Sequence, residues 1–431
     1  MNILLVNPPN CGRSVPEEHY GMDSIRQIFR GEPLALEALA GNLTDHTVRI
    51  LDLKVAPDGL ADALAQFQPD LVGITGMTCE ANAMVRIAGQ VKSQGNAIVV
   101  VGGIHASNDP EFFNVPAIDY VVVGLGKASF RQLIGQILAT GSGGGIPGVA
   151  RTDPGKLLQV ASRAYDATDL VPERPPAYGL VAANRDQYRL ETLGLSMGFA
   201  ITAFGCPHHC NFCCIEALTG GRYLPYPVEA VVRDIRLLGD VPVIRFVDAN
   251  TFQDVARAKA LWRGIAEAGI QKQFFADVRA DMVVRHPEVL REWKQIGLRA
   301  VIVGFEEIDQ LRLTEMGKGC KADDYRKAID ILHEQGIAIV GDFIISPDYS
   351  ENDFESLRRY IRETAIELPI LSVLTPLPGT PLYRTMADRI VIRDLDFYTL
   401  TNSVVRTRLP EKNFYGLYAE LTKTFHRKPA V

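Results

Sequence analysis

The 431-residue sequence has no apolar run that approaches the roughly 20 residues needed to span a bilayer, so we expect no transmembrane helix. It also has no excess of positive charge, because 45 basic and 51 acidic side chains leave a formal net charge of -6. This balance provides no electrostatic footprint for nucleic acid, and we expect no nucleic-acid partner. Only seven cysteines occur, three of them in one short loop. That usage excludes a disulfide framework and favours a reducing, cytoplasmic location.

Two further signals are missing. The first residues carry no basic segment, and their apolar run is only of strand length before it ends at Pro8 and Pro9. We therefore expect no signal peptide. No Ser-His-Asp or Cys-His nucleophile set is recognisable, so the sequence gives no indication of covalent catalysis by a side chain.

The cysteine-rich loop is the most informative feature that is present. Cys206, Cys210 and Cys213 follow the spacing C-x3-C-x2-C. A [4Fe-4S] cluster is normally held by four thiolates, so three in one loop suggest that one iron stays open to an exogenous ligand. The alternatives are a buried thiol cluster or half of a zinc site, although no partner C-x2-C pair follows downstream. We expect His208 and His209, in the same loop, to be loop residues rather than metal ligands.

This spacing, with Phe212 just before the last cysteine, resembles the radical S-adenosylmethionine (SAM) superfamily. The resemblance implies that the three cysteines bind a [4Fe-4S] cluster and that the open iron binds SAM. It also places Phe212 at the SAM site. Reduction of such a cluster implies an electron donor such as flavodoxin or ferredoxin.

The first 140 residues alternate short apolar runs with helical patterns, which predicts a parallel sheet with crossover helices. The strands are expected at residues 2–6, 47–51, 71–75, 97–101 and 120–123. Small or polar residues follow each strand. In an open α/β sheet, the loops at the carboxyl ends of the strands line the ligand crevice, and glycine lets the backbone approach a large planar ligand.

Two runs in this region, VVVGGIHAS at 99–107 and VVVGLGKASF at 121–130, resemble the cobalamin-binding domains fused to one subgroup of radical SAM enzymes. Two departures stand out: the signature that supplies a histidine to cobalt is absent, and the usual Gly-Glu-Gly-Glu run is Gly-Leu-Gly-Lys here. The first departure implies cobalt without a histidine lower ligand. The alternative is a nucleotide-binding or vestigial Rossmann-like unit, but no dinucleotide fingerprint follows the first strand. The resemblance implies cobalamin contacts from Asn7, Thr75, Gly76, Thr78, Gly102, Gly103, His105, Gly124 and Gly126.

From residue 195 onward, strand and helix signals alternate again, with strands expected at 197–203, 243–247, 274–278, 300–303, 338–344 and 370–375. Six such units suit the partial barrel of the radical SAM superfamily. The predicted fold is thus α/β: a Rossmann-like cobalamin-binding domain, then a partial (β/α)6 barrel and a small C-terminal helical extension. Glycine-rich and proline-rich stretches between the two units predict a linker. The expected boundaries are 1–145, 146–190 for the linker, 191–385 for the barrel and 386–431 for the extension.

Active sites of such barrels collect at the carboxyl ends of the strands. By position in the superfamily pattern, Asp248 and Asn250 after the second strand are expected near the SAM amino group. Arg279 after the third strand is expected to pair with the SAM carboxylate, with a salt bridge at the barrel rim as the alternative. Glu306 after the fourth strand would accept hydrogen bonds from SAM, whereas Glu307 is expected to face solvent.

These two resemblances together imply methylation of an unactivated carbon, with a 5'-deoxyadenosyl radical abstracting hydrogen and methylcobalamin donating the methyl group. One alternative keeps both cofactors but carries out oxidative ring formation or ring rearrangement. A second alternative is a cobalamin-binding sensor without turnover.

Two stretches, 29–37 and 394–415, are similar to hopanoid C-3 methylases of this subgroup. This similarity predicts a triterpenoid lipid as the small-molecule substrate, and hence peripheral contact with a membrane surface. A peptide, antibiotic or tetrapyrrole substrate is the alternative. The spacing of Phe414, Leu417 and Leu421 instead predicts a helix that packs against the barrel.

Overall fold

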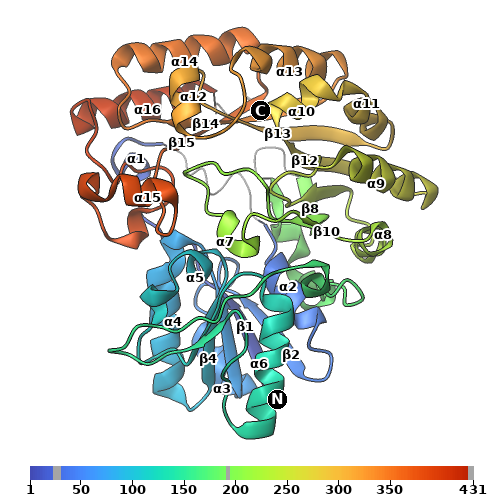
Figure 1. Ribbon diagram of the computed structural model, residues 1–431, viewed down its shortest axis with the longest axis vertical. Helices are drawn as coiled ribbons and strands as arrows, with labels where there is room; N and C mark the ends of the chain where they lie inside the picture. The colour runs from blue at the N-terminus through green and yellow to red at the C-terminus, as the bar shows by residue number, and fades with distance from the viewer. Residues whose placement is uncertain (23–30, 191–194, 426–431) are drawn as a thin grey trace.

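The computed structural model of the chain describes residues 1–22, 31–190 and 195–425, and it shows two α/β units stacked along the long axis of the molecule (Figure 1). Phe29 and Arg30, in the first stretch compared with hopanoid methylases, lie outside the described residues, as do residues 191–194 at the expected start of the barrel. Within the described part of the chain, no helix combines the length and the apolar character needed to cross a bilayer.

The first unit is built on a six-stranded sheet in the order β2-β1-β3-β4-β5-β6, with β6 antiparallel and the other strands parallel. The central strands are runs of Val, Ile and Leu because parallel strands are covered on both faces. Accordingly, successive residues of β1 belong to two different cores, with Leu4 in one and Leu5 in the other. The strands are β1 (Asn2–Asn7), β2 (Thr47–Asp52), β3 (Leu71–Thr75), β4 (Ile98–Gly102), β5 (Tyr120–Val122) and β6 (Val149–Arg151).

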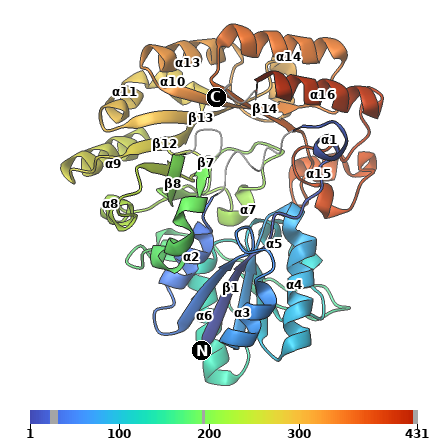
Figure 2. The same cartoon turned by 180° about the vertical axis from the view of Figure 1, so that it is seen from behind.

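Helices cover both faces of this sheet, as Figures 1 and 2 show from opposite sides. The five strands predicted from the apolar runs are present, each within one residue or so of its expected bounds. β6 was not predicted; it is three residues long and comes from the segment expected to be linker. The domain boundaries themselves stay a prediction. The main helices are α2 (Leu34–Gly41), α3 (Leu60–Phe67), α4 (Ala81–Gln94), α5 (Ile104–Asn108) and α6 (Gly126–Thr140).

The second unit is a curled sheet in the order β15-β14-β13-β12-β11-β8-β7, in which six strands are parallel and β7 is antiparallel. This confirms the predicted partial (β/α)6 barrel. The strands are β7 (Arg189–Leu190), β8 (Leu195–Ala200), β11 (Val243–Phe246), β12 (Gln273–Val278), β13 (Leu298–Glu306), β14 (Ala338–Ile345) and β15 (Leu368–Val373).

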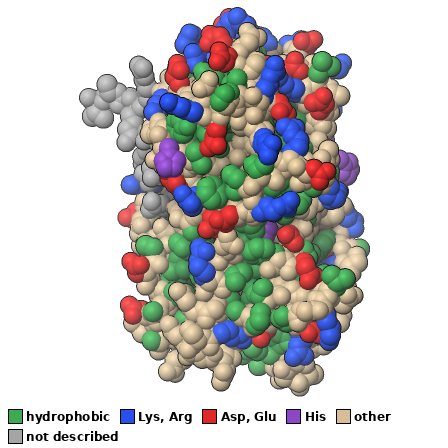
Figure 3. Space-filling model, turned by 90° about the vertical axis from the view of Figure 1, so that its left-hand side faces the viewer, with side chains coloured by type: hydrophobic (Ala, Val, Ile, Leu, Met, Phe, Trp, Pro, Cys, Tyr) green, Lys and Arg blue, Asp and Glu red, His purple; other side chains and the backbone are tan. Residues whose placement is uncertain are grey.

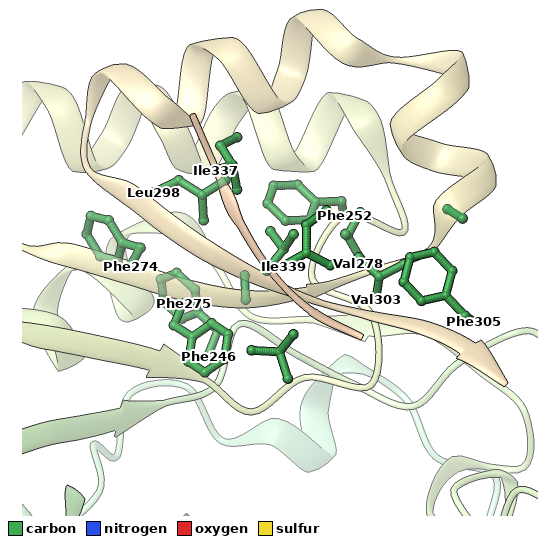
Figure 4. Close-up of a cluster of buried hydrophobic side chains, with 14 of the residues drawn as sticks. Phe246, Phe252, Phe274, Phe275, Val278, Leu298, Val303, Phe305, Ile337 and Ile339 are labelled. Carbon is green, nitrogen blue, oxygen red and sulfur yellow. The ribbon is translucent and has the colours of Figure 1, made fainter. Parts of the chain in front are cut away.

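Helices pack on the convex side of the curled sheet, and aromatic side chains fill the space between them (Figure 4). Phe246 of β11 and Phe274 of β12 stack on each other with ring centroids 5.5 Å apart. Both also contact the edge of Trp293, which is fully buried on α11 (Pro287–Gln295). Such aromatic pairs contribute both buried area and directional contacts. The other covering helices include α8 (Val228–Leu237), α9 (Val255–Glu267), α10 (Ala280–Arg285), α13 (Asp323–Glu334) and α14 (Glu351–Thr364).

The C-terminal extension ends in α16 (Glu411–Phe425), which packs on α14. The ring of Phe414 lies 5.6 Å from that of Phe354 on α14, and both side chains are fully buried. The helical spacing of the tail therefore serves packing against the barrel, as predicted. The molecular surface in Figure 3 carries positive and negative side chains side by side, in agreement with the small net charge.

The carboxyl ends of both sheets face the space between the two units. Short helix α7 (Glu216–Thr219), which follows the cysteine loop, lies in this space in Figures 1 and 2. The side-chain amide of Asn108, at the end of α5, donates a hydrogen bond of 3.0 Å to the carbonyl oxygen of Cys214. The loop after the first barrel strand is thus tied directly to the first unit.

Candidate functional site

A cavity of about 360 Å³ opens at the carboxyl ends of β1, β3, β4 and β5. Its volume lies within the roughly 300–1,000 Å³ of typical ligand pockets. Helix α2 supplies an apolar wall that includes Leu36 and Leu39. Seven of the nine residues predicted to contact cobalamin line this cavity, namely Asn7, Thr75, Gly76, Gly102, Gly103, Gly124 and Gly126.

The barrel unit completes the cavity. Phe204, Leu218 and Tyr226, which come from the segment around the cysteine loop, contribute to its lining. Sequence reasoning missed these three residues because no local pattern marks a side chain that closes a cavity on another unit. The cavity therefore lies between the two units rather than inside the first one alone.

Two predicted residues, Thr78 and His105, do not line the cavity. The ring of His105 is fully buried, and its centre lies 5.2 and 5.5 Å from the centres of the Phe112 and Phe113 rings, both in T-shaped arrangements. Burial lowers the pKa of His105 to about 4, so the imidazole is neutral at physiological pH. Neither of its ring nitrogens has a hydrogen-bond partner among the described residues. Its surroundings are those of a packed core residue.

The glycines at the strand ends are needed for close packing within the protein. Gly103 has a φ of 95°, and a Cβ there would lie 2.3 Å from the Thr75 hydroxyl oxygen. Gly124 has a φ of 74°, and a Cβ there would overlap the ring of Tyr165, whose hydroxyl donates to the carbonyl of Val123. A positive φ and a close neighbour each exclude larger residues. We had expected glycine to admit a ligand; at these two positions the neighbours are protein atoms.

Lys127, where the family run has glutamate, occupies a structural position at the cavity wall. Its ammonium donates to the carbonyl oxygens of Val171 at 2.8 Å and Arg174 at 2.6 Å. It also lies 5.9 Å from the centre of the Tyr226 ring. Burial lowers its pKa to about 8. Lys127 therefore fastens the segment between the two units to the first unit.

The cysteine loop runs from β9 (Ala203–Phe204) to α7 and is held by backbone hydrogen bonds on two sides. The amide of Asn211 donates to the carbonyl of Met316 at 3.0 Å, and the amide of Leu382 donates to the carbonyl of Asn211 at 2.9 Å. The loops after β13 and β15 therefore position this loop. Phe212 is partly buried and packs against an apolar cluster formed by residues of the first unit and of the segment after β15, and its contact with SAM stays a prediction.

The three thiols of the loop are free and partly exposed. Burial raises the pKa of Cys213 to about 12 and also raises that of Cys210, although Lys318 and Arg279 oppose the shift at Cys210. Nearby cations favour the thiolate form that binds metal. Within the described residues, no three His, Cys, Asp or Glu side chains converge as a metal-ligand set. The assignment of the three cysteines as cluster ligands therefore stays a prediction.

Glu306, at the end of β13, forms a buried ion pair that sequence reasoning missed. Its carboxylate lies 2.6 Å from the ammonium of Lys318, and both side chains are about one-tenth exposed. Glu306 also has a φ of 64°, an uncommon conformation for a residue with a side chain. Such backbone strain is concentrated at functional sites, where the surrounding structure holds it. The Met-Gly-Lys-Gly segment at 316–319 was the only sequence signal for Lys318.

Arg279 adjoins this pair. Its guanidinium donates to the Lys318 carbonyl at 3.0 Å and to the sulfur of Cys320 at 3.1 Å, and it pairs with Asp281 at 3.0 Å. The salt bridge at the barrel rim, which was the alternative reading of Arg279, is therefore present. Pairing with a ligand carboxylate stays a prediction.

Asp248 and Asn250 are both buried after β11. The Asp248 carboxylate accepts from the Thr202 amide at 2.6 Å, the Thr202 hydroxyl at 2.5 Å and the Ala203 amide at 3.1 Å, which anchors the chain just before the cysteine loop. Asn250 donates to Gln253 at 2.8 Å, and Gln253 contacts the ring of His208 at 3.1 Å. The Asn250 side-chain oxygen is buried without a partner among the described residues. These residues support the loop, and their contact with SAM stays a prediction.

One expectation was wrong. Glu307 was expected to face solvent, but it is 2% exposed. Its carboxylate accepts from the Tyr349 hydroxyl at 2.8 Å and from the Ile308 amide at 2.8 Å. The turn after β13 points both neighbouring carboxylates inward, because the left-handed backbone at Glu306 breaks the usual alternation of strand side chains.

Two family models match the sequence. The B12 binding domain matches residues 29–134, and the radical SAM superfamily matches residues 201–361. The first match covers the strand ends that form the cavity, and the second covers the cysteine loop through α14.

The chain is similar to several curated proteins. It is 29% identical over 407 residues to the hopanoid C-3 methylase of Methylococcus capsulatus, which covers 92% of this chain and 76% of the relative. It is 25% identical over 389 residues to the anaerobic magnesium-protoporphyrin IX monomethyl ester cyclase of Cereibacter sphaeroides, covering 86% of this chain and 61% of the relative.

Solved structures share the fold. The radical SAM methyltransferase TsrM from Kitasatospora setae, with cobalamin and a [4Fe-4S] cluster bound, matches with a TM-score of 0.69 at 21% identity, over 90% of this chain and 75% of that one. The cobalamin-dependent SAM radical enzyme OxsB matches with a TM-score of 0.73 at 16% identity, over 97% of this chain and 65% of that one. The similarity thus extends across both units and their connection.

Proposed function

The chain belongs to the radical SAM enzymes that carry an N-terminal B12-binding domain, and from this we propose that it is a cobalamin-dependent methyltransferase that methylates an unactivated carbon. The observation that carries the proposal is the placement of two sites at one interface. Phe204 and Leu218, which flank the cysteine loop, line the cavity of the first unit, and Asn108 forms a hydrogen bond that ties the loop to that unit.

The cavity fits part of a large, mostly apolar cofactor. Its walls are the strand ends, whose backbone is exposed there, and the apolar face of α2. Polar groups are few, and the Lys54–Glu80 pair, 2.7 Å apart, is the charged pair on its wall. We propose that these residues hold the corrin and its nucleotide tail. Because His105 packs against Phe112 and Phe113 and does not line the cavity, we propose that cobalamin would bind without ligation by His105.

The donor set of the cysteine loop fits a [4Fe-4S] cluster with one open iron. Cys206, Cys210 and Cys213 are unpaired thiols on one short loop. Arg279 and Lys318 lie close enough to Cys210 to influence its ionisation. We propose that these two cations also attract the carboxylate of SAM, as charge-assisted partners do.

When bound, these cofactors would supply a 5'-deoxyadenosyl radical for hydrogen abstraction and a cobalt-bound methyl group for transfer. The residues of the chain orient the two cofactors and exclude water. Phe204, Leu218 and Tyr226 line the cavity on the barrel side. We propose an external electron donor such as flavodoxin or ferredoxin, and no nucleic acid as partner.

For the substrate we propose a triterpenoid lipid, reached at a membrane surface. The support is the similarity to hopanoid C-3 methylase over nine-tenths of the chain. The C-terminal tail adds no support for a lipid pocket, because Phe414 packs against Phe354 on α14.

The test is anaerobic reconstitution with iron, sulfide and cobalamin, followed by incubation with SAM, a reductant and a bacterial lipid extract. We expect stoichiometric corrin, 5'-deoxyadenosine, S-adenosylhomocysteine and a lipid heavier by one methylene group. Absence of corrin would contradict the function of the first unit.

The second candidate is oxidative cyclisation. It is favoured by the 25% identity to the magnesium-protoporphyrin ester cyclase. Corrin and 5'-deoxyadenosine without S-adenosylhomocysteine would support this alternative, since ring formation consumes no methyl group. Incubation with a magnesium-porphyrin methyl ester in place of the lipid extract would then give the product mass.

A further inference from the structure

The concave face of the barrel sheet is incompletely packed. On β14, Ile339, Phe343 and Ile345 are buried on one face, whereas Asp342 and Ile344 on the other face stay partly accessible. On β15, the residues that alternate with the buried Leu371 and Val373 are also partly accessible. The buried set faces the helices, since the ring of Phe343 lies 6.3 Å from that of Tyr360 on α14. The accessible set therefore faces the concave side, toward the space between the two units.

A layer of charged residues crosses this concave face. Arg245 of β11 and Asp277 of β12 form an ion pair of 2.5 Å, and the guanidinium lies 5.0 Å from the centre of the Phe275 ring. The layer continues at β13, where Glu306 pairs with Lys318. Asp342 of β14 ends the layer. Apolar side chains flank it on β13, β14 and β15, namely Ile302, Ile344 and Ile370.

Gly304 shapes the space beside Asp342. The two residues are direct neighbours in the register of β13 and β14. A Cβ on Gly304 would lie 2.5 Å from the Glu306 carboxylate and 2.8 Å from the Lys318 ammonium. The ion pair thus lies over the glycine, which has no side chain of its own to reach Asp342 at this level.

Asp342 is the unsatisfied member of the layer. Each of the other charged residues in the layer has an oppositely charged partner at 2.5 or 2.6 Å. Among the described residues, none forms a hydrogen bond or an ion pair with the Asp342 carboxyl group. A half-buried carboxyl group without a partner is costly unless a ligand or a proton satisfies it.

We propose that Asp342 is a specificity-determining residue whose carboxyl group hydrogen-bonds a hydroxyl or carbonyl oxygen on an otherwise apolar substrate. The substrate would lie on the concave face of the barrel, with its hydrocarbon skeleton against Ile302, Ile344 and Ile370. This inference rests on the proposed function and adds a chemical requirement to it: a pure hydrocarbon is a poor substrate.

The electrostatics of the layer agree with a donor role. Burial, followed by the neighbouring Glu306 and Asp277 carboxylates, raises the pKa of Asp342 to about 8, and Lys318 and Arg245 only partly oppose this. Below that pH the carboxyl group carries a proton and can donate to an oxygen atom. Above it, the group ionises and can only accept, so it would repel a carbonyl oxygen but could still accept from a hydroxyl.

The experiment uses the full-length holoenzyme and three variants: Asp342→Leu, Asp342→Asn and, as a matched control, Glu355→Gln on the exposed side of α14. The measured quantity is the ratio of 5'-deoxyadenosine formed with and without a detergent-solubilised probe. The probes are a triterpenoid alcohol and the hydrocarbon that differs from it only by lacking the hydroxyl. Bound corrin and S-adenosylhomocysteine are measured in the same samples.

We expect the alcohol to stimulate the wild type and the control about tenfold more than the hydrocarbon does, the discrimination that one hydrogen bond supports. Asp342→Leu should lose this difference, whereas Asp342→Asn, whose amide still donates, should keep part of it. With the matching ketone as probe, which can only accept a hydrogen bond, stimulation of the wild type should fall as pH rises through about 8. The same pH range should leave the Asn variant unchanged.

Three outcomes would overturn the inference. The first is equal stimulation of the wild type by alcohol and hydrocarbon, or by neither. The second is an Asp342→Leu enzyme that still distinguishes them. The third is an Asp342→Leu enzyme in which SAM cleavage with and without the probe falls by the same factor. That result would mean that Asp342 stabilises the barrel or contributes to SAM binding, and that it does not recognise the substrate. By contrast, wild type without corrin or S-adenosylhomocysteine would overturn the proposed function itself.

Discussion

The strand ends of both sheets lie at the same interface, but they carry different types of residue. The first sheet ends in glycines, threonine and asparagine around a largely apolar cavity. The barrel sheet ends in charged residues, with Glu306 and Lys318 paired over Gly304 and Arg279 bonded to the Lys318 carbonyl. The first surface suits recognition by shape, and the second suits a small, charged ligand.

Buried carboxylates show the same difference. In the barrel, Glu306 is about one-tenth exposed and has a cation at 2.6 Å. In the first unit, Glu37 on α2 is fully buried, and neither of its carboxylate oxygens has a partner among the described residues. Glu306 is therefore compensated by a neighbouring cation, whereas Glu37, like Asp342 in the barrel, is left to protonation. Four predictions test this contrast, from the largest effect to the smallest.

The largest effect is expected from the cysteine loop. Replacement of Cys206, Cys210 or Cys213 by alanine should abolish both the iron content after reconstitution and the formation of 5'-deoxyadenosine, because two thiolates cannot hold the cluster. Corrin binding should remain, since the cavity is formed by other residues. The neighbouring Cys214→Ala is the control and should keep its cluster. A single-cysteine variant that retains iron and SAM cleavage would refute the ligand assignment.

The second prediction concerns the opposite case, a change that impairs corrin binding and leaves the cluster intact, by filling the cavity of the first unit. Ala38 lines it from α2, and Ala38→Trp should lower corrin affinity at least about tenfold by occupying apolar space. Iron content should not change. Ala139→Trp, on the exposed end of α6, is the control for an added indole. Equilibrium dialysis with cobalamin measures the difference, and normal binding by Ala38→Trp would show that corrin does not use this cavity.

The ion pair of the barrel provides the third test. Lys318→Met leaves the Glu306 carboxylate buried and unpaired, so we expect the free energy of unfolding to fall by roughly 3 kcal/mol. The SAM concentration needed for half-maximal cleavage should rise as well. The exposed pair Lys327–Asp324 is the control, because Lys327→Met should cost less than ~1 kcal/mol. The Glu306→Gln/Lys318→Met double variant should recover part of the lost free energy of unfolding. Denaturant unfolding measures all of these variants.

The smallest effect is expected at Glu37. Burial, with a contribution from Asp52, raises its pKa to about 8, so the folded state holds a proton that the unfolded state releases above its ordinary pKa. Stability is therefore lost as pH rises from that ordinary value to about 8. Glu37→Gln removes this penalty and should raise the melting temperature by roughly 2–4 °C at pH 8.5.

The gain from Glu37→Gln should shrink as pH falls and disappear in acid, where both states are protonated. Glu334→Gln, on an exposed helix surface, should show no such pH dependence. Scanning calorimetry at several pH values measures both variants. A gain that does not change with pH would mean that the Glu37 carboxyl group has a partner or stays ionised.

The fold could be predicted from local patterns because buried parallel strands are continuous apolar runs bounded by turn residues. The strand predicted at 71–75 coincides with β3, and that predicted at 338–344 is one residue short of β14. β6 was missed because three residues in an edge strand leave no period to detect. Glu307 was misplaced because a left-handed residue before it changes the direction of its side chain.

Among the residues of the candidate sites, some could also be predicted from local patterns and others could not. Loops after the strands of one sheet must meet at one edge, so seven of the nine predicted cavity residues could be found without coordinates. Lys318, Tyr226 and Asp342 could not, because their positions depend on segments that are distant in the chain. The packing of His105 against two phenylalanine rings also appears only in the structure, because no local pattern indicates it, and its contact with cobalamin stays a prediction.

The sequence alone determined the order of the two units, the two sheets and the three-cysteine loop, because apolar periodicity and residue spacing are local properties of a chain. Only the tertiary structure decided which charges are paired, which carboxyl groups are left without partners and how the barrel closes the cavity of the first unit. Pairing and burial depend on distances between residues far apart in the chain, and no local pattern encodes these distances.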